Sequence, residues 1–161
     1  MPSIVDRPAQ RYVAERATLG IEDFPRIADR LPPLIGTLAG RGIVPAGAPF
    51  FRYRVLHPGM RFTVEAGVPV DGEFDLREPA FLGEVPAGKY VLETYVGAPD
   101  GLAAATADVL AWGAAEGVTW DVTEGPDGEE WGGRLEVLRT NPLEVPDPAD
   151  WVTDLLFRLA D

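Results

Sequence analysis

The chain of 161 residues contains no cysteine, and it has a single serine (Ser3), a single histidine (His57) and a single lysine (Lys89). The lack of cysteine excludes disulfide bonds, cysteine-ligated zinc and a thiol nucleophile. A Ser-His-Asp triad is not expected, because the one serine is the third residue of the chain. Charged residues interrupt the first dozen positions, where a signal peptide needs an apolar stretch. We therefore expect a cytoplasmic protein.

Basic residues are also scarce. There are 14 Lys and Arg residues against 26 Asp and Glu residues, which gives a formal net charge of −12. Such a surface repels nucleic-acid phosphates and anionic membranes, and it attracts cations. No apolar run is long enough to span a bilayer. With 46% hydrophobic and 25% charged residues, the composition is that of a globular domain. We expect one domain over residues 1–161, with no direct nucleic-acid binding and no membrane contact.

The chain contains an internal repeat. Residues 8–15 (PAQRYVAE) are similar to residues 86–93 (PAGKYVLE), and each segment leads through a glycine-containing turn into a helical pattern. The pattern predicts two related halves, at about residues 3–72 and 80–161.

Each half has one predicted helix. In the first half, apolar residues recur at three- and four-residue steps from Phe24 to Leu38. Pro32 and Pro33 are expected to kink or split that helix, because proline cannot donate the backbone hydrogen bond of a helix interior. In the second half, a helix through Trp112 is expected to end at Gly117.

Two extended segments follow each predicted helix. They cover residues 50–56 and 61–70 in the first half, and residues 131–140 and 151–159 in the second. Residues 124–130 are interpreted as a surface turn. The sequence therefore predicts an α+β fold with duplicated strand-helix-strand-strand halves and pseudo-two-fold symmetry. It would have antiparallel sheets with one helix each and a ligand groove between the halves.

Glu136 is the first candidate functional residue. It alternates with Leu135 and Val137 along a strand, and we expect this apolar pair to face the helix and Glu136 to face the groove. A carboxylate in that position either has a raised pKa or binds a cation. The alternative is an ion pair with Arg134, Arg139 or an arginine on a neighbouring strand.

The aromatic residues form the second candidate feature. Tyr and Trp combine a flat apolar surface with a polar tip, which suits contacts with planar ligands and cations. Most aromatics of a chain this size belong to the core, so only some are expected to face a ligand. Together with Glu136, the predicted ligand-binding residues are Phe51, Tyr53, Tyr90, Tyr95, Trp112, Trp131, Leu138 and Phe157. His57 is interpreted as a turn residue, because a metal site would need it beside carboxylates such as Glu65 or Asp71.

Several motifs together resemble a known family. They are residues 85–90 (VPAGKY), the turn at residues 95–102 (YVGAPDGL), the helix through Trp112, and residues 135–138 (LEVL) with Asn141-Pro142. The order and spacing of these motifs resemble the GyrI-like small-molecule-binding domain, which is related to the effector-binding domains of AraC- and MerR-class regulators. The resemblance covers nearly the whole chain.

The resemblance implies a groove that binds bulky, planar, often cationic lipophilic compounds beside a glutamate, here Glu136. Some stand-alone members of the family look like hydrolases that open a strained cyclopropane in DNA-alkylating natural products. Glu136 would then be a general base or electrostatic anchor, and Tyr90 or Tyr53 would hydrogen-bond the reacting oxygen. Tyr95 and Pro99 depart from the family pattern. Because the repeat begins within the first dozen residues, we expect no helix-turn-helix domain before it.

Three functions therefore stay open. The first is a module that binds lipophilic aromatic cations as in xenobiotic sequestration, and the second is a hydrolase that uses the same groove and the catalytic pair Glu136 and Tyr90. The third is an interaction protein that docks on a separate protein partner. None of them requires a cofactor or a metal.

Overall fold

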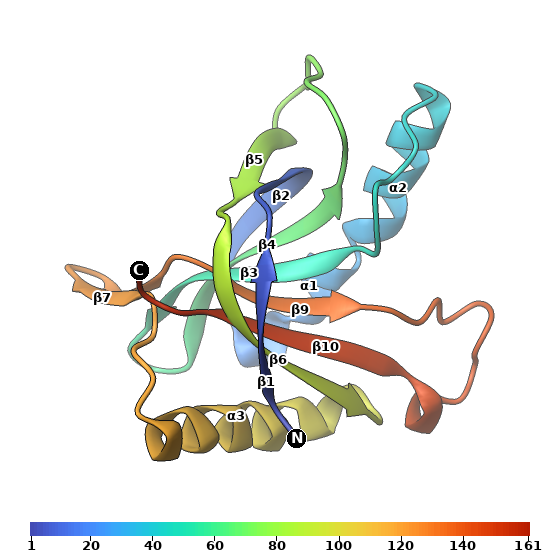
Figure 1. Ribbon diagram of the computed structural model, residues 1–161. Coiled ribbons are helices and arrows are strands. Elements are labelled where there is room, and N and C mark those ends of the chain that lie inside the picture. The colour runs from blue at the N-terminus through green and yellow to red at the C-terminus, as the bar shows by residue number, and fades with distance from the viewer.

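The computed structural model describes all 161 residues, and its centre is a single ten-stranded antiparallel sheet (Figure 1). Its strands are β1 (Ser3–Arg7), β2 (Gln10–Gly20), β3 (Phe50–His57), β4 (Arg61–Pro69), β5 (Phe81–Val85), β6 (Gly88–Val96), β7 (Val122–Gly125), β8 (Gly128–Trp131), β9 (Arg134–Leu138) and β10 (Val152–Arg158). The helices are α1 (Pro25–Ala28), α2 (Leu31–Gly40) and α3 (Leu102–Glu116), with short 3-10 turns at η1 (Ile21–Asp23), η2 (Pro99–Gly101) and η3 (Pro148–Asp150).

The strand order reveals the duplication. Along the sheet the order is β1-β6-β10-β9-β3-β4-β2-β5, so β6, β10 and β9 of the second half mirror β2, β4 and β3 of the first. The two predicted sheets are joined into one where β3 pairs with β9. The leading strands are exchanged, because β1 pairs with β6 and β5 pairs with β2. The predicted α+β class with antiparallel halves is confirmed.

The predicted helices are present, and α3 ends where the sequence predicts. Pro32 and Pro33 lie in the first turn of α2, where proline is tolerated, and the predicted long helix is accordingly split into α1 and α2. Helix α3 ends at Gly117, whose φ of 72° is a left-handed conformation that favours glycine. None of the helices has the length and hydrophobicity needed to cross a membrane.

One expectation about the strands is wrong. Residues 124–130 do not form only a surface turn, because β7 and β8 pair as a hairpin that extends the sheet from β3. The Pro126-Asp127 pair forms the tip of this hairpin. Trp131 ends β8, and two glycines separate it from β9, so the predicted strand over residues 131–140 is two strands.

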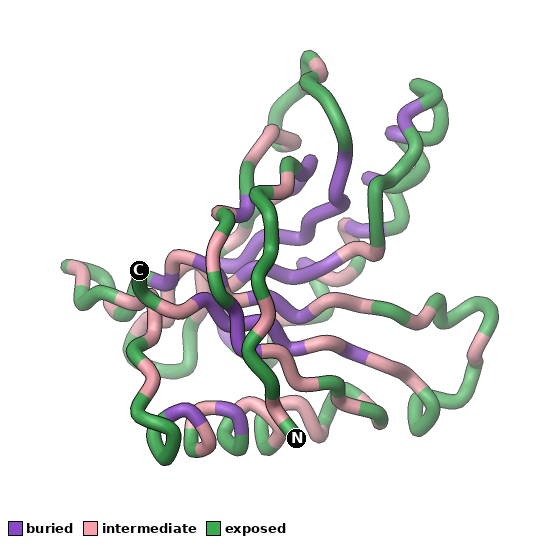
Figure 2. Tube along the Cα trace, viewed as in Figure 1, coloured by how far each residue is buried: buried purple, intermediate pink, exposed green.

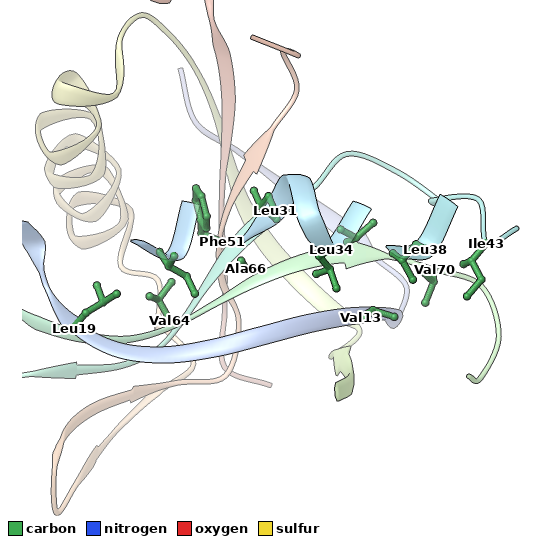
Figure 3. Close-up of a cluster of buried hydrophobic side chains, with 12 residues drawn as sticks. Val13, Leu19, Leu31, Leu34, Leu38, Ile43, Phe51, Val64, Ala66 and Val70 are labelled. Carbon is green, nitrogen blue, oxygen red and sulfur yellow. The ribbon is translucent and has the colours of Figure 1, made fainter. Parts of the chain in front are cut away.

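Buried residues concentrate in the central strands and on the inner sides of α2 and α3 (Figure 2). In the first half, Leu31, Leu34 and Leu38 of α2 pack against strand residues such as Val13 and Val64 (Figure 3). In the second half, Val109 of α3 packs in a cluster of strand residues that includes Val91, Leu155 and Phe157. Each half thus contributes its own helix-covered cluster.

Candidate functional site

Glu136 lies between the two helix-covered clusters, at the junction of the halves. Its cross-strand neighbours are Phe51 on β3 and Leu155 on β10. Directly opposed residues in an antiparallel sheet point to the same side. Phe51 belongs to the cluster under α1 and α2, whereas Leu155 belongs to the cluster under α3. The side chain of Glu136 therefore projects from the helix-bearing face of the sheet, between the two clusters. We call this region around Glu136 the seam.

This placement corrects the expected face of β9. We expected Leu135 and Val137 to face a helix, but they pack on the opposite side, in a cluster formed only by strand residues such as Tyr12, Phe50 and Tyr90. Both faces of β9 are buried there, so an apolar pair does not identify the face that carries the helices. The helix-free face is filled by side chains and does not line the site of Glu136.

The carboxylate of Glu136 is buried without an ion-pair partner. Glu136 is 8% exposed, and its Oε1 accepts a hydrogen bond of 3.0 Å from the Tyr53 hydroxyl. It forms no salt bridge, and Arg139, one of its expected partners, lies 3.6 Å from Asp154 instead. Burial raises the pKa of Glu136, and the Tyr53 hydrogen bond and the nearby charge of Arg134 offset only part of this increase. Proton uptake or a ligand cation would relieve the desolvation cost.

Aromatic rings surround this carboxylate on the first-half side. Tyr53 comes from β3, and burial together with the Glu136 charge raises its pKa well above the ordinary value, so it remains a hydrogen-bond donor. Phe24 stacks on Tyr53 with a centroid separation of 6.1 Å and meets Phe51 edge-on at 5.1 Å. Phe62 meets Tyr53 edge-on at 5.8 Å. Phe24 and Phe62 were not among the expected site residues.

On the second-half side, Trp131 and Phe157 lie in the cluster under α3, with ring centroids 5.7 Å apart. The guanidinium of Arg134 lies 4.8 Å from the ring centroid of each and 5.8 Å from that of Tyr53. Tyr53, Trp131 and Phe157 thus gather around Arg134, two residues from Glu136 on the same face of β9, and their role in ligand binding stays a prediction. Arg134 was considered only as an ion-pair partner of Glu136.

The other expected site residues lie around this centre or away from it. Leu138 packs against the cluster under α1 and α2. Trp112 on α3 packs against the second-half cluster, and its buried indole N–H has no hydrogen-bond partner. Tyr95, on the helix-bearing face of β6, donates a hydrogen bond of 2.6 Å to the Ala98 carbonyl, just before η2.

Tyr90 does not accompany Glu136. It is fully buried in the helix-free cluster, and its hydroxyl donates a hydrogen bond of 2.6 Å to the Pro86 carbonyl. The register pairs Val91, not Tyr90, with Phe157, so Tyr90 points to the opposite side from Glu136. This corrects the expectation that Tyr90 acts beside Glu136, and of the two tyrosines considered for that role only Tyr53 can reach it.

A second buried carboxylate lies on the helix-free face. Glu65 is fully buried and accepts hydrogen bonds from the Tyr12 hydroxyl and from Arg16, at 2.8 Å from Nε and 2.6 Å from Nη2. Arg54 lies 3.6 Å away. Glu65 was considered only as a metal ligand beside His57, whose ring nitrogens instead contact Thr63 and the Asp127 carbonyl. Unlike Glu136, Glu65 is fully paired.

Two cavities lie away from Glu136. One of about 300 Å³ lies beside α2 and is lined by Leu34, Leu38 and residues 75–77, among others. The other, of about 120 Å³, opens on the helix-free side next to Phe50 and Leu135. Glu136 lines neither of these cavities.

Comparison with known proteins places the fold. No family model and no curated protein sequence matches the chain. It superposes on EcmrR in its DNA complex with a TM-score of 0.80 and 16% identity, covering the whole chain but only 57% of EcmrR. The EcmrR C-terminal domain alone gives a TM-score of 0.76 at 15% identity, over all of this chain and 98% of that domain.

Two further solved structures share the fold. SAV2435 bound to tetraphenylphosphonium gives a TM-score of 0.65 at 11% identity, over 99% of this chain and 94% of that one. A hydrolase from Listeria innocua gives a TM-score of 0.63 at 11% identity, over 99% of this chain and 91% of that one. At these identities the likeness establishes the fold alone.

Proposed function

We propose that this protein binds lipophilic aromatic cations in the seam between its halves, with Glu136 as the anionic contact. The observation that carries the proposal is a buried carboxylate with one tyrosine hydrogen bond and no ion-pair partner, beside a cluster of aromatic rings around Tyr53 and Arg134. A carboxylate in such surroundings is stabilised by a cation that fills the low-dielectric space beside it. Aromatic faces add cation–π attraction.

Three further observations support the proposal. The net charge of −12 raises the local concentration of cations. The shared fold includes a protein solved with tetraphenylphosphonium, which is a lipophilic aromatic cation. Together with the motifs around Glu136, the fold agrees with a GyrI-like domain related to regulator effector-binding domains, and we assign the chain to that group as part of this proposal.

The direct test is a calorimetric titration with two ions of matched shape and opposite charge. We expect tetraphenylphosphonium to bind at micromolar concentration and tetraphenylborate to bind at least 100-fold more weakly, because a buried carboxylate repels the anion. Equal affinity for both ions would show that binding depends on apolar area alone. No binding of the cation to folded protein would contradict the proposal.

Hydrolysis is the second candidate, and the hydrogen bond between Tyr53 and Glu136 favours it. In a conjugated cyclopropane, Glu136 would accept a proton from water as the water oxygen bonds to a ring carbon. The broken ring bond would send its electron pair to the conjugated carbonyl oxygen, beside the Tyr53 hydroxyl. A hydrolase from Listeria innocua has the same fold.

For this candidate we expect mass spectrometry to show addition of one water to a cyclopropane-containing alkylating agent. The rate should fall at least tenfold in Tyr53→Phe, because the developing oxyanion loses its hydrogen-bond donor. A rate no faster than that without protein would leave binding as the only function proposed for the site.

A further inference from the structure

The guanidinium of Arg134 is in the position where a ligand cation would meet the aromatic rings of the site. Along β9, Arg134 precedes Glu136 by two residues, so both side chains leave the same face of the sheet. The register places Arg134 directly opposite Phe157 on β10. Its Cζ lies 4.8 Å from the ring centroids of Phe157 and Trp131 and 5.8 Å from that of Tyr53. Three aromatic rings, supplied by β3, β8 and β10, therefore surround one internal cation.

This internal cation is held without directional bonds. The Arg134 guanidinium makes no hydrogen bond and no salt bridge within the chain, and burial lowers its pKa. Nearby Arg52 differs, because it donates to the Tyr12 hydroxyl and to the Glu84 and Gly132 carbonyls at 2.8–2.9 Å. Arg158 is likewise bonded to Asp121 and to the Ala87 carbonyl. The Arg52 Nε–H has no partner, but its two terminal nitrogens make three hydrogen bonds, whereas the Arg134 guanidinium makes none.

A ligand cation can replace the contacts that the Arg134 guanidinium makes with the aromatic rings. A guanidinium on aromatic faces gains modest cation–π energy but leaves its N–H donors short of acceptors. Arg134 is half-buried, so its long side chain borders solvent and can move out, where water would satisfy those donors. A lipophilic cation has no N–H donors to satisfy, and it buries more apolar area against the same rings.

We propose that in the free protein the Arg134 guanidinium occupies the aromatic cation-binding subsite beside Glu136, and that a lipophilic aromatic cation displaces it. This inference rests on the proposed function and adds a determinant of specificity to it. Small hydrated cations cannot displace Arg134, because they bring no apolar area in return. Cations that carry several aromatic rings can, so Arg134 selects for that class and lowers the affinity for all its members.

The test compares Arg134→Met, which keeps the apolar stem and removes the charge, with Arg139→Met. Arg139 is on the same strand, is 54% exposed and pairs with Asp154, so its replacement makes the same change in net charge outside the site. In calorimetric titrations we expect Arg134→Met to bind tetraphenylphosphonium at least tenfold more tightly than wild type. Arg139→Met should stay within about twofold of wild type, as expected for an exposed charge.

A measurement on the unsubstituted protein covers the case in which Arg134→Met does not fold. The Arg134 Nε–H proton should show a ring-current shift in the 1H–15N spectrum, assigned by its loss in Arg134→Lys. Saturation with tetraphenylphosphonium should move it to the position of a solvent-exposed arginine. A resonance that keeps its shift when the cation is bound would overturn the displacement.

The possible outcomes distinguish a failure of the proposed role of Arg134 from a failure of the proposed cation binding. If wild type binds tetraphenylphosphonium and Arg134→Met binds it equally or more weakly, the proposed function is supported and the proposal that Arg134 occupies the cation subsite is wrong. Binding only by Arg134→Met would show that the cation cannot displace Arg134, which overturns the displacement and contradicts the proposed function of the wild-type protein. If neither protein binds the cation, the proposed function fails and this inference fails with it.

Discussion

Replacing Glu136 by Gln should weaken tetraphenylphosphonium binding at least tenfold, which corresponds to about 1.4 kcal/mol. The amide keeps the shape of the side chain and can still accept the Tyr53 hydrogen bond seen at 3.0 Å. It removes the negative charge in a place where 8% exposure leaves little solvent screening. Titration calorimetry on both proteins measures the difference.

Glu93→Gln provides the matched control. Glu93 is opposite Leu155, which is in turn opposite Glu136, so Glu93 lies two strands away on the same face. It is 23% exposed and pairs with the N-terminal amine at 3.5 Å. Two strand spacings are about 10 Å, close to the screening length in physiological salt. We expect less than a twofold change, and equal losses in the two variants would mean that only net charge matters.

The same substitution should change the pH dependence of both binding and stability. Burial raises the pKa of Glu136, so the carboxylate charges only as pH rises through a range above its ordinary value. Affinity for a permanent cation should therefore rise with pH across that range, up to tenfold per unit, and then level off. The Gln variant should show no such rise.

Stability should respond with the opposite sign. Below the pKa of the unfolded chain, Glu136 is protonated in both states and contributes no penalty. Between the unfolded pKa and the raised folded pKa, the unfolded state has lost its proton while the folded state keeps it, so the folded state is destabilised as pH rises through this range, and the loss levels off above the folded pKa. Glu136→Gln should therefore be more stable than wild type at neutral pH and equal to it in acid. A less stable variant at neutral pH would mean that the carboxylate has a favourable partner.

Sequence alternation was sufficient to identify Glu136 but not to place its surroundings. Because side chains alternate along a strand, the side chain of Glu136 points to the opposite face of the sheet from Leu135 and Val137, and this can be predicted without the tertiary structure. Which face carries the helices is set by tertiary packing, and Leu135 and Val137 pack with Tyr12, Phe50 and Tyr90 from distant strands. The composition of β9 does not predict those partners.

The two tyrosines show the same limit. Tyr53 and Tyr90 both lie in predicted strands, and the repeat made Tyr90 the more conspicuous. Their faces are decided by the registers of β3 with β9 and of β6 with β10, which pair residues far apart in the chain. The aromatic rings around Arg134 depend on such pairings as well, because Phe157 is 23 residues from Arg134 (157 − 134) and Tyr53 is in the other half.

Replacing Glu65 by Gln should have the opposite effect on stability from replacing Glu136. Glu65 is fully buried and accepts hydrogen bonds from the Tyr12 hydroxyl and from two nitrogens of Arg16 at 2.8 and 2.6 Å. Burial and the charge of Glu65 raise the pKa of Tyr12 to about 12, so its hydroxyl stays a donor. Glu65 thus accepts three hydrogen bonds, whereas Glu136 accepts one.

We expect Glu65→Gln to lower the free energy of unfolding by about 3 kcal/mol, the lower end for breaking a buried ion pair, because Arg16 is 49% exposed. Urea denaturation at pH 7 measures it. Glu15→Gln is the control, since Glu15 meets Arg30 at 3.7 Å near the surface and should cost less than about 1 kcal/mol. A Glu65→Gln protein as stable as wild type would contradict the structural role.

The folded fraction of Glu65→Gln should still bind tetraphenylphosphonium with wild-type affinity. Glu65 lies opposite Arg16 and Arg52, and Arg52 lies next to Phe51 on β3 and therefore points away from the face of Glu136. The sheet itself separates the two carboxylates. One buried glutamate would then stabilise the fold and the other would bind the ligand, because the arginines that neutralise Glu65 have no counterpart bonded to Glu136.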